Sequence, residues 1–401
     1  MAISSASVSA SVSLWQLFLI FFRLGCSSFG GPVAHLGFFR HEFVEKRQWY
    51  SEQRYAELVA LCQFLPGPAS SQVGIAIGLN AAGYRGALLS WLGFTMPSAI
   101  LMLSFAFVYL GFAQNSDTLW LSGLKIVAVA VVAQALWGMG KSLCPDPARA
   151  SIALLSAVLM LLLSGVLVQI AVMLLAAIIG KAILPQPPQA SPQATSITGK
   201  ASALFFLFLF ILLLTLLPLL AQLTNNSWLS LFDSFYRAGA LVFGGGHVVL
   251  PLLQTELVPQ GLLSDEAFLA GYGAAQALPG PLFTLATYLG AVSATSLLPG
   301  ALLATVAIFL PAFLLLFAAL PWWQQLSRYP AMRQAMAGIN AAVVGLLLAA
   351  LYDPVFVSAI HGPVELAFAL LAFLALMYWK VPPYIVVLLA VITGFIISWF
   401  N

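Results

Sequence analysis

Charged residues are scarce in this sequence of 401 residues. They make up 7% of the chain, against about 25% in an average soluble protein. Apolar residues make up 62%, and the mean hydropathy is +1.02. This composition excludes a soluble enzyme, a nucleic-acid-binding protein and a disordered chain. A transmembrane β-barrel is excluded as well, because its strands alternate apolar and polar residues. The predominantly apolar run at 201–220 is instead long enough to cross a bilayer as a helix.

Cysteine and histidine are also rare, with three and four residues. Cys26, Cys62 and Cys144 lie far apart and predict neither a disulfide framework nor a zinc site, and no HxxxH pair occurs. Walker A, HExxH and GxSxG motifs are missing, so we expect no ATP-driven pump, no enzyme, no metal and no cofactor. Residues 1–13 lack Lys and Arg and predict a polar tail rather than a secretory signal.

The second half of the chain repeats the first at an offset that stays between 213 and 215 residues. The matched positions are Phe22-Arg23 with Tyr236-Arg237, Phe29-Gly30-Gly31 with Phe243-Gly244-Gly245, Glu42 with Glu256, Gln63 with Gln276, Pro66-Gly67-Pro68 with Pro279-Gly280-Pro281, Pro97 with Pro311 and Lys125 with Asn340. The sequence therefore predicts two homologous transporter repeats, at 14–184 and 229–401. Residues 185–228 join them through a polar linker and a connecting transmembrane helix.

Basic residues predict that the two repeats are inverted relative to each other. The first repeat places Arg40, Lys46, Arg47 and Arg54 in one loop, whereas the matching loop at 251–268 holds no Lys or Arg. By the positive-inside rule the first loop is cytoplasmic and the second is not. The predicted fold class is therefore an all-α polytopic membrane protein with two inverted-topology repeats, an arrangement common in secondary transporters.

Glycine and proline interrupt the apolar segments at four matched places. Two breaks are Phe-Gly-Gly at 29–31 and 243–245, and two are Pro-Gly-Pro at 66–68 and 279–281. We predict broken or re-entrant helices there, and tilted helices with simple kinks remain the alternative. Pro32 and Pro68 suit the first turn of a returning half-helix, whose free N–H groups and dipole attract anions. Matched broken segments predict a transport site, because irregular backbone at membrane depth lines a cavity or is buried.

Candidate substrate-binding residues lie at these breaks or just before them. They are Arg23, Phe29, Gly30, Gly31, Gln63, Arg237, Phe243, Gly244, Gly245 and Gln276, with Pro66, Gly67, Pro68, Pro279, Gly280 and Pro281 as hinges or gates. An arginine inside a membrane is costly and is by default a functional candidate, since its fork fits an oxyanion. Snorkelling to the headgroups and ion pairing are the alternatives, and Asp233 stands one helical turn before Arg237. For the two glutamines, hydrogen bonding between helices is the alternative.

Four further residues are candidates for coupling transport to an ion. Lys125, His247, Glu42 and Glu256 are polar or charged groups within or beside apolar helices. Histidine and lone acids carry protons in membrane proteins. The alternatives are a packing role for His247 and likewise for His35, a helix-end position for Lys125, and a cap or interfacial position near the loops for both glutamates.

With these motifs in view, the chain resembles the chromate ion transporter family, CHR, in its two-domain form. The resemblance rests on Phe22-Arg23-Leu24-Gly25, Ser28-Phe29-Gly30-Gly31-Pro32, Gln63-Phe64-Leu65-Pro66-Gly67-Pro68, Phe243-Gly244-Gly245-Gly246-His247, the second Pro-Gly-Pro motif and Gly338-Ile339-Asn340. It implies a multi-pass inner-membrane protein that exports chromate, confers chromate resistance and uses the proton-motive force, with proton antiport as one mode.

The residues themselves predict only an anion, plausibly a tetrahedral oxyanion, so sulfate is the natural competitor of chromate. The leading hypothesis is alternating access around a midplane site. An uncoupled anion channel and a non-transporting membrane assembly factor or sensor are the rival hypotheses. The expected partners are the oxyanion, protons and the lipid bilayer, with a homodimer left open.

Overall fold

The computed structural model describes residues 12–29, 31–113, 119–163, 165–185, 199–243, 248–323 and 329–397, and these contain helices and no strand. The first repeat comprises α1 (Leu14–Ser27), α2 (Gly31–Arg40), the π-helix η1 (His41–Lys46), α3 (Glu52–Phe64), α4 (Ala69–Ala113), α5 (Leu119–Leu143), α6 (Pro147–Leu162) and α7 (Val166–Ile183). The connecting helix is α8 (Lys200–Thr224). The second repeat comprises α9 (Ser227–Leu241), α10 (Val249–Leu257), α11 (Asp265–Gln276), η3 (Leu282–Thr284), α12 (Leu285–Ser293), α13 (Leu297–Ala319), η4 (Leu320–Trp322), α15 (Pro330–Ala350), η5 (Leu351–Phe356), α16 (Val357–Ala359), α17 (Pro363–Met377) and α18 (Pro383–Ile397).

Five helical segments in the described residues are long and apolar enough to cross a membrane. They are Ala69–Gly111, Gly123–Leu143, Lys200–Thr224, Leu297–Trp322 and Pro330–Ala359. The predicted all-α polytopic class is therefore confirmed, and the segment Lys200–Thr224 has the length and composition that the predicted connecting helix requires. The helices that flank the Phe-Gly-Gly break of the first repeat are shorter. α1 has 14 residues and α2 has 10, so neither spans a bilayer alone, which takes about 20 residues.

Helices end and restart at the predicted breaks. Ser28, Leu65 and Val242 each follow the end of a helix and have extended backbone. Gly31 opens α2 with a φ of +77°, a left-handed angle that glycine adopts at little cost. Pro68 directly precedes α4. The alternative of continuous helices with simple kinks is therefore wrong for these segments.

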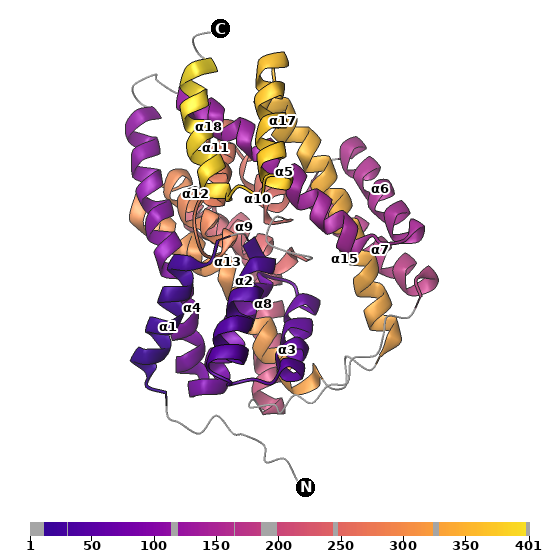
Figure 1. The fold of residues 1–401 in the computed structure, drawn as a ribbon. Helices are drawn as coiled ribbons and strands as arrows, with labels where there is room; N and C mark the ends of the chain where they lie inside the picture. Colours follow the sequence, from indigo (N-terminus) through magenta and orange to yellow (C-terminus); the bar gives the residue numbers. More distant parts are fainter. Residues whose placement is uncertain are drawn as a thin grey trace.

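The two repeats occupy the molecule in opposite senses. Figure 1 shows α2 and α3 in its lower half, whereas their counterparts α10 and α11 lie in its upper half. Matching N-caps support the alignment, because Ser51 Oγ accepts from the Arg54 N–H and Ser264 Oγ accepts from the Ala267 N–H. The prediction that the segment beginning at Leu14 returns to the side of the membrane where it starts stays a prediction.

Glycine pairs close a tight helical hairpin after the Pro-Gly-Pro break in each repeat. A Cβ on Gly78 would lie 2.4 Å from the carbonyl oxygen of Gly86, and a Cβ on Gly290 would lie 2.4 Å from that of Gly300. In the first repeat the hairpin turns inside α4, where Gly83 has a φ of +65°. The equivalent turn separates α12 from α13.

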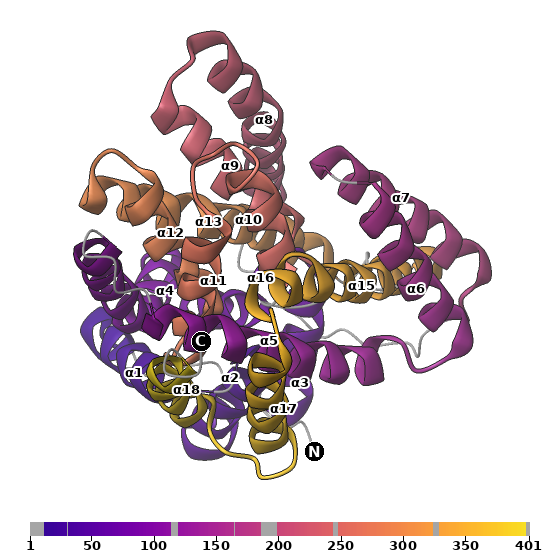
Figure 2. The same cartoon turned by 90° about the horizontal axis from the view of Figure 1, so that it is seen from above.

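The last helical hairpin of each repeat packs on the other repeat. α6 and α7 pack along α15, whereas α17 and α18 pack along α5 (Figure 2). The α7–α15 contact is close, since a Cβ on Gly338 would lie 2.0 Å from the carbonyl oxygen of Ala176. This exchange interlocks the repeats around their shared centre.

Candidate functional site

The four breaks of the two repeats meet at the centre of the molecule. The Gly67 N–H donates to the carbonyl oxygen of Val242 at 2.6 Å, and the Gly280 N–H donates to that of Ser28 at 2.8 Å. Each donor belongs to the Pro-Gly-Pro break of one repeat, and each acceptor precedes the Phe-Gly-Gly break of the other. The two hydrogen bonds are therefore equivalent under the repeat. We call this region, at 28–29, 31, 65–68, 242–243 and 276–281, the crossing.

Both donors at the crossing have a backbone conformation that favours glycine. Their φ angles are +118° for Gly67 and +95° for Gly280, values that residues with a side chain rarely adopt. A Cβ on Gly67 would lie 3.4 Å from Cβ of Ala312, and a Cβ on Gly280 would lie 3.4 Å from the carbonyl oxygen of Phe94. Each Pro-Gly-Pro break thus lies close to a helix of the opposite repeat.

Buried polar side chains gather on the first-repeat side of the crossing. Ser28, His35, Ser71, Gln72 and Thr95 are each at most 3% exposed. Each carries a polar atom without a hydrogen-bond partner among the described residues, namely Ser28 Oγ, His35 Nε2, Ser71 Oγ, Gln72 Oε1 and Thr95 Oγ1. Burying an unpaired polar group costs about 1–3 kcal/mol. Each of these atoms is therefore open to a polar partner such as a water or an ion.

Hydrogen bonds position this polar group of side chains. His35 Nδ1 lies 3.3 Å from Ser70 Oγ, and its ring meets Phe94 edge-on at 5.3 Å. Gln72 Nε2 donates to the Pro66 carbonyl oxygen at 2.8 Å. Ser98 Oγ donates to Thr284 Oγ1 at 3.0 Å and so links the two repeats. His35 thus has a packing role together with one unpartnered ring nitrogen.

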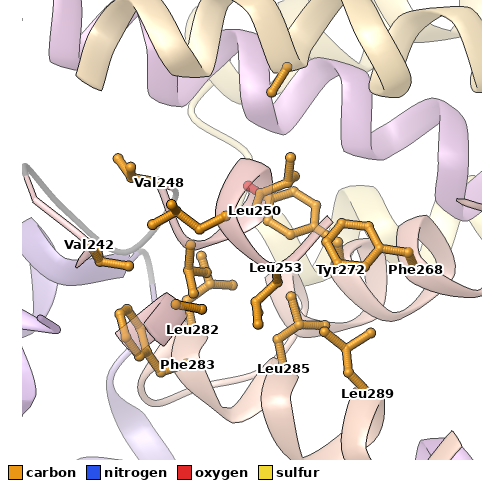
Figure 3. Packing of buried hydrophobic residues seen from close by; sticks show 14 of the residues in the cluster. Val242, Val248, Leu250, Leu253, Phe268, Tyr272, Leu282, Phe283, Leu285 and Leu289 are labelled. Carbon is orange, nitrogen blue, oxygen red and sulfur yellow. The ribbon is translucent and has the colours of Figure 1, made fainter. Parts of the chain in front are cut away.

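The described residues on the second-repeat side of the crossing are mostly apolar, with the polar side chains of Gln276 and Thr284 among them. Figure 3 shows Val242 beside Phe283 and Leu282, with Leu250 and Leu253 of α10 above them. All five are buried. The two repeats therefore contribute unequally, in contrast to the symmetric site that the matched motifs predict. Gly30, Gly244, Gly245 and His247 lie outside the described residues, so their predicted roles stay predictions.

Arg237 lies between two carboxylates. Its Nη2 is 2.9 Å from Asp233 Oδ2 and 2.8 Å from Glu256 Oε2. The predicted pairing with Asp233 is confirmed. Glu256 was expected near a loop, but it is 2% exposed, because α10 folds back along α9 and carries it to Arg237. The guanidinium is thus neutralised. It can make the predicted substrate contact only after its ion pairs with Asp233 and Glu256 have broken.

Arg23 has different surroundings from Arg237. The side of α1 that packs on α4 carries Leu17, Phe21 and Leu24, and Arg23 lies on the exposed side. No ion pair joins Arg23 to a described residue. It therefore does not enter the crossing, and a direct substrate contact remains a proposal.

Of the other predicted substrate-binding residues, some lie at the crossing and some lie away from it. Gln276 lies at the crossing with its Nε2 buried and unpartnered within the described residues, whereas Gln63 is exposed at the end of α3. Phe29 is half-buried, with its ring centre 4.9 Å from that of Tyr384 on α18. Phe243 is half-buried beside the large apolar core.

Lys125 and Glu42 form ion pairs at the ends of helices. Lys125 Nζ lies 3.3 Å from Glu266 Oε1, which joins α5 of one repeat to α11 of the other. Glu42 accepts hydrogen bonds from Arg47 Nε at 2.7 Å and Lys46 Nζ at 3.2 Å. Partial burial raises the pKa of Glu42, but these two hydrogen bonds outweigh it and leave the pKa below its usual value.

Comparison with known proteins agrees with this two-repeat architecture. The chromate transporter family model matches residues 15–181 and again 229–395. The chain belongs to the chromate transporter family. It is 28% identical to a chromate transport protein of Pseudomonas aeruginosa, over 98% of this chain and 95% of the relative. It is 29% identical to a chromate transport protein of Cupriavidus metallidurans, over 92% and 89%.

A further relative is an uncharacterized transporter of Methanocaldococcus jannaschii, 24% identical over 96% of this chain and 94% of that protein. No solved structure matches the chain. Membership of the chromate transporter family supports a function in chromate transport, and a transporter family implies a protein that is not an enzyme.

Sequence reasoning singled out the backbone breaks but missed most of the polar side chains around them. Ser70, Ser71 and Gln72 follow the first Pro-Gly-Pro break after Ala69, whereas the second is followed by the largely apolar Leu282-Phe283-Thr284. Three polar residues in the first turn of an apolar helix were a usable signal. No such signal marks Thr95 and Ser98, because isolated hydroxyl groups are common in membrane helices.

Proposed function

We propose that this protein is a secondary active transporter that exports chromate, or a similar tetrahedral oxyanion, across the cytoplasmic membrane by alternating access. Export would confer resistance to chromate. The proton-motive force would supply the energy, with proton antiport as the mode of coupling. The crossing is the observation that carries this proposal, because it brings four broken segments of two inverted repeats to one buried polar place.

The chemistry of the crossing suits an oxyanion. α2 and α4 both begin there, and the first N–H groups of a helix have no partner within the helix. These N–H groups and the helix dipoles attract negative charge. The hydroxyl groups of Ser28, Ser71 and Thr95 add donors that a tetrahedral dianion accepts on several oxygens. Sulfate has the same shape and charge, so we expect it to compete with chromate.

Arg23 has a supporting role in this proposal. An exposed guanidinium without an ion pair in the described part of the chain raises the local concentration of anions. We propose that Arg23 draws the oxyanion towards the crossing, while neutral donors hold it there. Arg237 remains with its two carboxylates in the conformation described.

Chromate uptake into everted membrane vesicles tests this function. We expect uptake that depends on energisation and falls when sulfate is added in excess. Uptake that merely follows the anion gradient, without energy-dependent accumulation, would identify an uncoupled anion channel. No movement of chromate, sulfate or molybdate above vesicles that lack the protein would refute the proposal.

A further inference from the structure

Asp233, Arg237 and Glu256 form a buried cluster with more negative than positive charge. Asp233 is 3% exposed and Glu256 is 2% exposed, and both bind the same nitrogen of Arg237. One guanidinium neutralises only one of two carboxylates. A buried charge without a counter-ion is costly, and a group in that position commonly binds a proton instead. Asp233 Oδ1 is buried and has no hydrogen-bond partner among the described residues.

The elements that surround this cluster do not complete its charge balance. α8 and α13 pack on α9, and their only charged residue is Lys200 at the start of α8. The elements packed on α10 bring Asp265 and Glu266 from α11, Arg333 from α15 and Lys181 from α7. Asp265 accepts a hydrogen bond from Gln254 Nε2, and Glu266 pairs with Lys125. Within the described residues, Arg237 is the cation that contacts Asp233 and Glu256.

The equivalent hairpin of the first repeat has a different conformation. α9 and α10 pack along each other, whereas α1 and α2 barely touch. Arg23 and Glu42 occupy the positions of Arg237 and Glu256 but do not pair, because Glu42 binds Arg47 and Lys46. One hairpin is therefore closed by an ion pair, and its counterpart is open.

Inverted-repeat transporters alternate by moving one repeat against the other. The opposite-facing state then follows when the two hairpins exchange conformations. In that state the α9–α10 hairpin opens and Arg237 leaves both carboxylates. Removing one partner of a buried ion pair costs about 3–5 kcal/mol when the remaining charge stays unpaired. Protonation of the carboxylates removes this cost.

We propose that Asp233 and Glu256 form a proton-binding site that couples proton entry to anion export. Arg237 forms ion pairs with the carboxylates while the hairpin is closed. When the hairpin opens, a proton binds in place of the guanidinium. Each step converts a carboxylate and a proton into a carboxylic acid, or reverses this, and changes no other bond. The positive-inside rule places the adjoining loop at 251–268 outside, where protons are supplied. The inference rests on the proposed transport function.

Proteoliposomes that contain the full-length protein and a trapped pH-sensitive dye test the coupling. Sulfate is the probe, since it stays a dianion over the pH range used. Glu256→Gln and Asp233→Asn are expected to keep sulfate–sulfate exchange. The sulfate flux that a proton gradient drives is expected to fall at least tenfold in both variants. Glu52→Gln, which changes an exposed glutamate of the first repeat outside the cluster and the crossing, is the control and is expected to keep that flux. Unchanged proton-driven flux in both cluster variants would overturn the proposal.

A measurement that needs no transport keeps the proton site testable if the proposed function fails. Hydrogen–deuterium exchange of the purified protein reports opening of the hairpin at 227–257. After division by the intrinsic amide exchange rate at each pH, we expect acidification to lower protection in this hairpin of the wild type, and Glu256→Gln to show lowered protection at every pH. Protection in this hairpin that is independent of both pH and the substitution would exclude the proton site. A wild type that moves no oxyanion would refute only the transport function.

Discussion

Gly67 donates its backbone N–H to the carbonyl oxygen of Val242 at 2.6 Å, across the boundary between the two repeats. Gly280 and Ser28 form the equivalent bond at 2.8 Å. Two hydrogen bonds related by the repeat fix the Pro-Gly-Pro break of each half against the end of a helix in the other half. A rocking motion of one repeat against the other therefore has to turn about these two hydrogen bonds or break them.

Replacing Gly67 by alanine tests the need for glycine at the crossing. Alanine at a φ of +118° costs about 1–3 kcal/mol in backbone strain, and its Cβ would lie 3.0 Å from Gln72 Nε2. We expect Gly67→Ala to lower oxyanion uptake at least tenfold, with the protein still inserted in the membrane. Gly37→Ala is the control, since nothing lies within 4 Å of a Cβ on this helical glycine. Uptake by Gly67→Ala at the level of this control would contradict the account.

Arg237 is expected to stabilise the fold through its two carboxylates. Arg237→Gln leaves Asp233 and Glu256 buried without a counter-charge, at a cost of about 3–5 kcal/mol. We expect a clear fall in the thermal unfolding midpoint of the purified protein. The double variant Arg237→Gln with Glu256→Gln removes one carboxylate as well and is expected to recover most of this loss. A double variant less stable than Arg237→Gln would show that the charge balance is not the cause.

Arg23 is expected to affect transport without affecting stability. It is exposed and forms no ion pair with a described residue, so Arg23→Gln should change the free energy of unfolding by less than about 0.5 kcal/mol. The initial rate of uptake should fall at low ionic strength, and the difference from the wild type should shrink as salt screens the charge. A rate equal to that of the wild type at low salt would remove Arg23 from the anion path.

Cysteine labelling in intact cells tests the inverted topology. Ser51 and Ser264 are exposed N-caps at matching positions of the two repeats. In a background without Cys26, Cys62 and Cys144, a membrane-impermeant thiol reagent should label Ser264→Cys and leave Ser51→Cys unlabelled. Labelling of both cysteines from outside would end the inverted-repeat account.

The sequence predicts the backbone of the crossing well, because glycine and proline act locally. The repeat, the breaks and the charge asymmetry of the loops each follow from residue types at matched positions. Pairing of Arg237 with Asp233 was also predictable, since residues four apart share a helical face.

The asymmetry of the crossing was not predictable from the sequence. An alignment of the repeats treats Arg23 and Arg237, or Glu42 and Glu256, as equivalent. Their surroundings differ because α10 packs along α9 while α2 leaves α1, and tertiary packing decides between these conformations. For the same reason, the sequence does not predict that the last helical hairpin of each repeat packs on the other repeat. Apolar helices of similar composition fit either repeat.

Binding of sulfate to the purified protein tests most directly whether the crossing is the anion site. A hydrogen bond to a charged group is worth about 1.5–3 kcal/mol, which corresponds to at least a tenfold change in Kd. We predict that Ser28→Ala, Ser71→Ala and Thr95→Val each weaken sulfate binding at least tenfold. Ser104→Ala, whose exposed hydroxyl bonds the Ile100 carbonyl of its own helix, should bind like the wild type. Wild-type affinity in all three crossing variants would contradict the account.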